Sequence, residues 1–175
     1  GTKAEHYRYT SLAATSLYTS LSDLETFFKV FLKGHEHEPL GRNVLQPETI
    51  TTMRKPHAST MGIDIWGLGT ILFAPTNNGD FIIGHDGKST PPLNTAIRLN
   101  PQTGDGIIVL ETGNAILATK LASEWVFWKT GEVDVLLFTM LQDNMVSTIG
   151  IGWLIIILLS LIIGIVRYRR RSVSS

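Results

Sequence analysis

A run of 21 residues without a charged side chain, from Val146 to Val166, constrains this chain more than any other feature. A helix of that length covers about 30 Å, which matches the hydrocarbon core of a bilayer. A buried helix of a soluble protein is seldom apolar on every face, and a cleaved signal peptide lies at the other end of a chain. The sequence therefore predicts one membrane-spanning helix at residues 146–166.

The charges on either side of this run predict its orientation. Arg167, Arg169, Arg170 and Arg171 follow it, whereas the nearest charged residue before it is Asp143. Because basic flanks remain in the cytoplasm, we expect a single-pass protein of the cell membrane with a basic cytoplasmic tail at residues 167–175. The body then faces the periplasm or the cell exterior. The apolar juxtamembrane segment, residues 132–145, either extends the membrane helix or lies along the lipid surface.

Composition excludes several classes of function. The chain has 15 Lys+Arg and 15 Asp+Glu, and removing the four tail arginines leaves 11 basic against 15 acidic residues, a net charge of −4. An acidic body argues against nucleic acid as a partner, because phosphate binding requires a basic face. The absence of cysteine excludes disulfides, thiol catalysis and Cys-ligated zinc.

One short segment has a spacing that could bind a metal. His35-Glu36-His37-Glu38 would place both histidines on one face of a strand, but the segment follows the glycine that should end a helix. A zinc site also requires a third ligand in place. A solvated loop is therefore favoured, and we expect neither a metal nor a cofactor.

The first part of the body should contain two helices. Ser22 with Glu25 has the pattern of a capping box, and Gly34 is suited to end the helix. Pro47 should begin a short second helix that ends before Pro56. The first helix has one apolar stripe, formed by Leu24, Phe27, Phe28, Phe31 and Leu32.

The remainder of the body should form antiparallel strands and a last helix. Apolar segments separated by turn residues predict strands at 63–66, 70–73, 81–83, 95–99 and 107–110. Asn114 is suited to cap the last helix and Gly131 to end it. Its apolar face is expected to consist of Leu117, Leu121, Trp125 and Trp128. This order predicts an α+β fold for residues 1–131.

A candidate site lies at Gly84-His85-Asp86-Gly87, directly after an apolar strand. A histidine in this position is held rigidly, and a glycine beside it allows a substrate to approach the backbone. Taken alone, so short a motif favours the end of a strand with a solvated histidine over a site.

Three segments carry a family resemblance. They are residues 16–24 with Phe27, the motif at residues 84–87, and residues 98–114, which contain two strand segments, Pro101 and Gly104, and end at Asn114. In this order they resemble the C-terminal part of the serine β-lactamase and penicillin-binding-protein-like hydrolases. That family includes class C β-lactamases, D-alanyl-D-alanine carboxypeptidases, D-aminopeptidases and esterases. The first segment is similar to the family's Gly-Leu-Tyr-Ser-Thr-Ala-x-Asp-Leu helix start, and the second to its third active-site motif.

The resemblance implies hydrolysis of an amide or ester through an acyl-enzyme. It implies that His85 organises the electrostatics around a Ser, a Lys and a Tyr, and that the Lys88 N–H is one of two oxyanion donors. Gly87 would admit the substrate along the strand. Asp86 replaces the usual Thr or Ser that contacts a substrate carboxylate, so it should repel that carboxylate unless Lys88 offsets it. This substitution favours esters or amine-bearing D-amino acid amides.

The sequence also departs from the family. It contains no Ser-x-x-Lys and no Tyr-x-Asn, and both motifs precede the helix start in the family. We therefore expect the chain to be the C-terminal portion of a longer protein and to be inert alone. Lys129-Thr130-Gly131 spells the penicillin-binding version of the third motif, but its place after the last helix predicts a helix C-terminus. The alternative function is a non-catalytic envelope protein that uses the fold as a binding surface.

Overall fold

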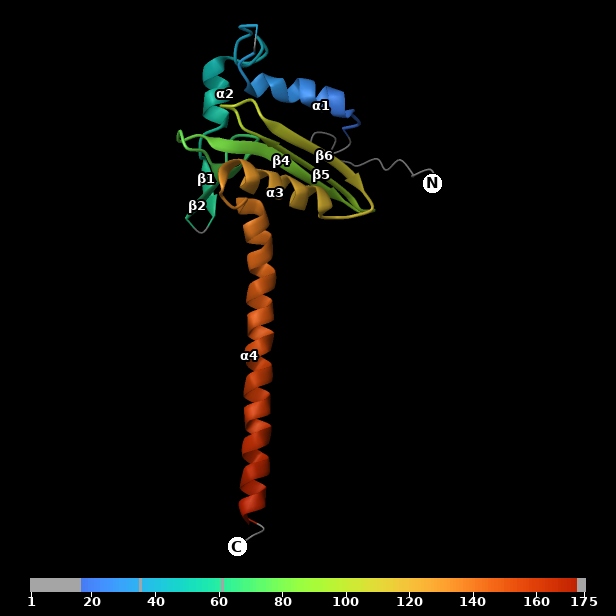
Figure 1. The fold of residues 1–175 in the computed structure, drawn as a ribbon, viewed down its shortest axis with the longest axis vertical. Helices are drawn as coiled ribbons and strands as arrows, with labels where there is room; N and C mark the ends of the chain where they lie inside the picture. The colour runs from blue at the N-terminus through green and yellow to red at the C-terminus, as the bar shows by residue number, and fades with distance from the viewer. Residues whose placement is uncertain (1–16, 35, 61, 173–175) are drawn as a thin grey trace.

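A six-stranded antiparallel sheet forms the centre of the body (Figure 1). The structure is a computed structural model that describes residues 17–34, 36–60 and 62–172. Each strand pairs with the next one along the chain. The strands are β1 (Ala58–Thr60), β2 (Ile63–Trp66), β3 (Ile71–Pro75), β4 (Phe81–Ser89), β5 (Leu93–Leu99) and β6 (Gly106–Thr112).

Helices cover both faces of the sheet. In Figure 1, α1 (Leu21–Phe28) lies on one side of the sheet and α3 (Leu117–Thr130) on the other. The 3₁₀ turn Lys29–Phe31 continues α1, and α2 (Pro47–Met53) follows after a loop. The long helix α4 (Val135–Ser172) leaves the body on the side of α3. The expected α+β fold class is confirmed.

The start and the end of α1 differ from the prediction. The capping box is formed by Ser20 and Asp23: Ser20 Oγ accepts from the Asp23 N–H at 3.2 Å, and the Asp23 carboxylate accepts from the Ser20 N–H at 3.3 Å. The expected pair, Ser22 with Glu25, lies two residues too late. The helix also ends at Phe28, before Gly34, because the 3₁₀ turn changes the direction of the chain and buries Phe31.

The second helix and the turns agree with the sequence prediction. Pro47 occupies the first turn of α2 and Ile50 is fully buried. The predicted turns separate β3 from β4 and β5 from β6. Two features were not predicted: the short exposed strand β1, and the continuation of β4 to Ser89.

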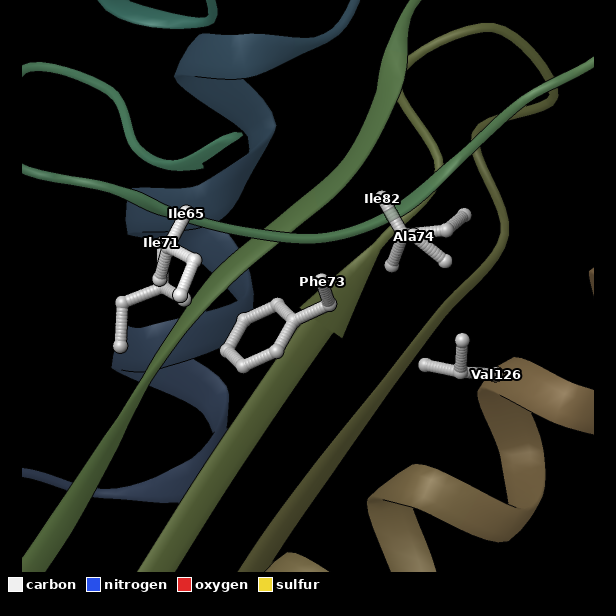
Figure 2. Packing of buried hydrophobic residues seen from close by; sticks show 6 residues of the cluster. All are labelled: Ile65, Ile71, Phe73, Ala74, Ile82 and Val126. Atoms are coloured by element: carbon white, nitrogen blue, oxygen red, sulfur yellow. The ribbon is translucent and has the colours of Figure 1, made fainter. Parts of the chain in front are cut away.

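Two apolar clusters lie on opposite faces of the sheet. The adjacent residues Ile82 and Ile83 of β4 belong to different clusters, because successive side chains of a strand point to opposite faces. Figure 2 shows the first cluster, in which Val126 of α3 approaches the sheet; it consists of Ile65, Ile71, Phe73, Ala74, Ile82 and Val126. The second lies on the side of α1 and α2 and consists of Phe31, Ile50, Leu72, Ile83 and Leu99.

Helix α3 packs on the sheet with a face that shares only Trp125 with the predicted one. Its buried residues are small or medium-sized: Ala118, Thr119, Ala122, Ser123 and Val126. Leu121 and Trp128, expected inside, are 47% and 75% exposed. Small side chains allow the helix to approach Ala96 of β5 closely, which a face of Leu and Trp would prevent. The predicted end is confirmed, because Gly131 has a left-handed φ of 75°. At the start the N-cap residue is Ile116, and Asn114 Oδ1 accepts from the Ile116 and Leu117 N–H groups.

Helix α4 is continuous from Val135 to Ser172. Of the two alternatives for the juxtamembrane segment, the structure therefore shows an extension of the long helix. Within the part of the chain that the structure describes, one helix is long and apolar enough to cross a membrane, at Val135–Ile165, and none of its most apolar part is buried in the body.

Candidate functional site

The candidate motif lies where β4 continues past its neighbour β3. The pairing of β3 with β4 runs from Pro75 opposite Phe81 to Ile71 opposite Gly84. Residues 85–89 continue the strand and pair with β5 alone among the described strands. The motif therefore lies along a strand edge that β3 does not cover.

His85 projects from this edge into solvent. Its Nδ1 lies 2.7 Å from the carbonyl oxygen of Asp86, and a carbonyl oxygen only accepts, so Nδ1 carries the hydrogen in this contact. In the neutral ring, this tautomer leaves Nε2 as an acceptor. The ring is thus oriented by its own strand and presents a basic nitrogen outward.

Asp86 points to the opposite face of the sheet, beneath α3. Its carboxylate forms an ion pair with Arg98 of β5, and its Oδ2 accepts from the Thr119 hydroxyl at 2.7 Å. Its side chain is only 12% exposed. The expectation of an uncompensated charge beside the substrate does not fit this placement, because a guanidinium neutralises the carboxylate and the strand separates it from His85.

Arg98 is the centre of a buried polar network. The residue is fully buried, its Nε donates to Asp134 Oδ2 at 2.8 Å, and its guanidinium carbon lies 3.3 Å from the centre of the Phe73 ring. The other oxygen of Asp134 accepts from the N–H groups of Leu136 and Leu137. Asp134 therefore caps the first turn of α4 and ties that turn to the sheet.

Asn94 completes the network on β5. Its amide nitrogen donates to the Gly87 carbonyl oxygen at 3.1 Å, and its Oδ1 accepts from the Thr119 N–H at 3.0 Å. These two bonds join the motif strand to the start of α3. Sequence reasoning missed the structural roles of Asn94, Arg98, Thr119 and Asp134. An arginine between Ile97 and Leu99 in an apolar strand was the available signal.

Gly87 and Lys88 occupy the end of the free edge. Gly87 lies opposite Thr95, and a Cβ at this position would overlap with Thr95 Oγ1. Lys88 lies opposite Asn94, and its side chain is exposed. The structure thus places His85, Gly87 and Lys88 along one open strand, while Asp86 is withdrawn into the interior.

A shallow cavity of about 230 Å³ lies between α1 and the sheet. Phe28, Leu32 and Ile97 are among its lining residues. His85 is not one of them, although its ladder partner Ile97 is. The cavity is thus close to the motif but does not contain it.

Lys129-Thr130-Gly131 forms the end of α3, as predicted. Lys129 Nζ lies 3.0 Å from Asp105 Oδ2 and 4.8 Å from the centre of the Trp128 ring. The hydrogen bond from Lys129, together with that from Thr103, lowers the pKa of Asp105 below its ordinary value. This lysine therefore has a structural partner at the helix end.

The His-Glu segment forms an exposed loop where it is described. Glu38 binds Arg42, and its carboxylate also accepts from the Glu36 N–H at 3.0 Å. Backbone hydrogen bonding and the Arg42 contact lower the pKa of Glu38. His35 lies outside the described residues.

No family model matches this chain, and neither a curated protein nor a solved structure matches it. The resemblance therefore depends on the motifs in the sequence alone.

Proposed function

We propose that this chain is the C-terminal portion of a membrane-anchored, β-lactamase-like serine hydrolase that cleaves an amide or ester bond through an acyl-enzyme. The observation that supports this most is the exposed His85 on the part of β4 that β3 leaves open. An open strand edge can bind an extended substrate through its main chain.

The proposed reaction divides its groups between this chain and residues upstream of it. A serine oxygen from a Ser-x-x-Lys motif attacks the substrate carbonyl carbon, and the serine proton passes to the upstream lysine or tyrosine. The Lys88 N–H donates to the oxyanion that forms. The bond to the leaving group then breaks, the leaving group takes a proton, and water hydrolyses the resulting ester. His85 supplies polar stabilisation beside the reacting atoms.

The substrate class is amide or ester, without a further preference from Asp86. A free Asp86 would favour esters or amine-bearing amides, but the ion pair with Arg98 removes that reason. Exposed Lys88 is the charged group of the motif that remains in solvent. Selectivity for the charge of the substrate is therefore determined by the upstream residues that supply the nucleophile.

The anchor in this proposal is α4, with the arginine-rich tail in the cytoplasm and the body outside. Its basis is the length and composition of Val135–Ile165 and the arginines that follow it. A reporter that functions only in the cytoplasm should be active when it is fused after Ser175. Activity of a reporter that requires the outer side would reverse this orientation.

One observation favours the non-catalytic alternative. The middle residue of the motif, Asp86, is held in a buried network, which is a structural rather than a catalytic arrangement. An envelope protein that binds a ligand along β4 would need this open strand but no catalytic groups. The upstream sequence separates the two functions, because only the hydrolase requires Ser-x-x-Lys and Tyr-x-Asn.

The direct test uses the full-length protein and the His85→Ala variant. We expect a loss of turnover of about 100-fold or more on ester or amide substrates, because the substitution removes a positioned polar group at an acyl-transfer site. His57→Ala is the matched control, since His57 is also exposed and its ring contacts a backbone carbonyl oxygen, that of Thr52, as the His85 ring does. Wild-type protein that takes no label from a fluorophosphonate would favour the binding protein instead.

A further inference from the structure

Helix α3 turns most of its large apolar side chains away from the sheet, whereas Trp125 packs against the cluster around Phe73. Its buried side carries Ala118, Ala122 and Val126, so the sheet is already covered by small and medium-sized groups. The outward side carries four large apolar residues with 40–75% of their surface exposed: Leu117, Leu121, Phe127 and Trp128. We call these four residues the α3 stripe.

Three of these four residues line up along α3. Leu117, Leu121 and Trp128 follow one another at helical intervals of four and seven residues, whereas Phe127 lies about 100° further round the helix. Lys120 and Glu124 are also exposed on this side and balance each other in charge. The outward side therefore combines large apolar groups with a net charge of zero, which fits a partner bound by the hydrophobic effect rather than by charge.

The stripe faces the same direction as the long helix. Figure 1 shows α3 on the side of the sheet from which α4 leaves, with α4 running away from the body on that side. Val135 and Leu136, in the first turn of α4, pack against the cluster that contains Val126 and Phe73. This packing fixes the orientation of the outer surface of α3 relative to the axis of α4.

The length of the apolar helix sets the height of α3. The candidate span Val135–Ile165 has 31 residues, which corresponds to about 46 Å of helix. A bilayer with its headgroup layers is about 40–45 Å thick. With residues 146–166 in the hydrocarbon core, the part of α4 that begins at Val135 rises about 16 Å above that core, which carries it through the headgroup layer to the base of the body. Residues 131–134 alone separate it from α3.

We propose that the α3 stripe lies in the headgroup region of the outer leaflet, with Trp128 as an interfacial anchor. The occupant of this surface is phospholipid, in the arrangement of an amphipathic helix that lies on a bilayer. This inference rests on the proposed membrane span of α4. Its consequence is orientation: α3 and the Asp86 face of the sheet turn toward the lipid, and His85 turns away from it.

The absence of cysteine allows a direct test with single cysteines. Leu121→Cys in the full chain is labelled with an environment-sensitive fluorophore and reconstituted into phosphatidylcholine vesicles with headgroup-level spin-labelled lipid. Leu110→Cys is the matched control, since Leu110 is 46% exposed against 47% for Leu121 and belongs to β6, on the opposite face of the sheet. We expect several-fold stronger lipid quenching at position 121 than at position 110.

Two further positions make every outcome decisive. Leu117→Cys is a second reporter on the stripe, and Leu158→Cys, quenched by acyl-chain-level spin label, reports the membrane span. Quenching at 158 with equal quenching at 121, 117 and 110 would overturn the surface contact while leaving the span intact. A blue-shifted but unquenched probe at 121 would show that protein covers the stripe and would also overturn the proposal. Loss of quenching at 158 would overturn both the span and the contact.

Discussion

Adjacent residues of β4 have opposite environments on the two faces of the sheet. His85 is exposed on the side of α1, whereas Asp86 lies beneath α3 and contacts Arg98 and Thr119. The pleat of a strand requires this separation, because neighbouring side chains point to opposite faces. The comparison shows that neighbouring residues of one motif can have different roles: one can be accessible to a ligand while the next stabilises the fold.

The two faces also differ in how much a substitution should cost. On the α3 face one guanidinium serves two carboxylates, and each hydrogen bond is shielded from water. Breaking a buried pair leaves an unpaired charge in the interior, which is far more costly than losing an exposed group. At His85, which is exposed, solvent replaces whatever a substitution removes.

Arg98→Met should have the largest effect. It leaves Asp86 and Asp134 without their cation, and we expect the free energy of unfolding to fall by about 3–5 kcal/mol. Denaturant unfolding of the full chain in detergent, followed by tryptophan fluorescence, measures this loss. Arg42→Met is the control, since Arg42 pairs with the more exposed Glu38, and it should cost far less. Similar losses for the two variants would contradict the special role of the buried network.

Asp86→Thr should cause the next largest loss in the free energy of unfolding. The substitution removes the ion pair with Arg98 and the hydrogen bond from Thr119, and we expect a loss of about 1.5–3 kcal/mol. His85→Thr, one residue earlier, should change the free energy of unfolding by no more than about 0.5 kcal/mol. An Asp86→Thr variant with unchanged stability and an altered preference for carboxylate-bearing substrates would restore Asp86 to the substrate site.

Gly87→Ala should have a moderate effect that a second substitution reverses. The new Cβ would overlap with Thr95 Oγ1, and we expect a loss of about 1 kcal/mol because the threonine side chain can rotate away at some cost. The double variant with Thr95→Ala should recover that loss. Gly84→Ala is the contrast, since its Cβ would meet the backbone oxygen of Ile97, which no side-chain change removes. Failure of Thr95→Ala to rescue would show that Gly87 is required for another reason.

The smallest effect concerns the exposed ion pair of Asp105 with Lys129. Its hydrogen bonds lower the pKa of Asp105 in the folded state. The stabilisation is therefore complete above the pKa of an unfolded aspartate and is lost as the pH falls through the lowered folded value. Unfolding of wild type and Lys129→Ala, compared between neutral and strongly acidic pH, should show a small difference that disappears in acid. A difference that persists in acid would assign Lys129 a role other than this pair.

Local features of the fold were predictable from the sequence. Pro47 at the start of α2 and Gly131 at the end of α3 each act through their own backbone preferences, and the structure has both. The capping box was displaced by two residues because Ser20 with Asp23 competes with Ser22 and Glu25, and the geometry of the approaching chain selects between them. For His85 the sequence allows both a site and a solvated strand end, and both fit its exposed position.

The sequence by itself determined the long apolar helix, the order of helices and strands, and the position of the turns, because each depends on residues within a few positions of one another. Only the tertiary structure decided which face of α3 meets the sheet and where the charge of Asp86 goes. Asp86 finds Arg98 12 residues away and Thr119 33 residues away, and Arg98 finds Asp134 36 residues away. Such contacts follow from strand register and helix packing, and no local pattern in the chain encodes them.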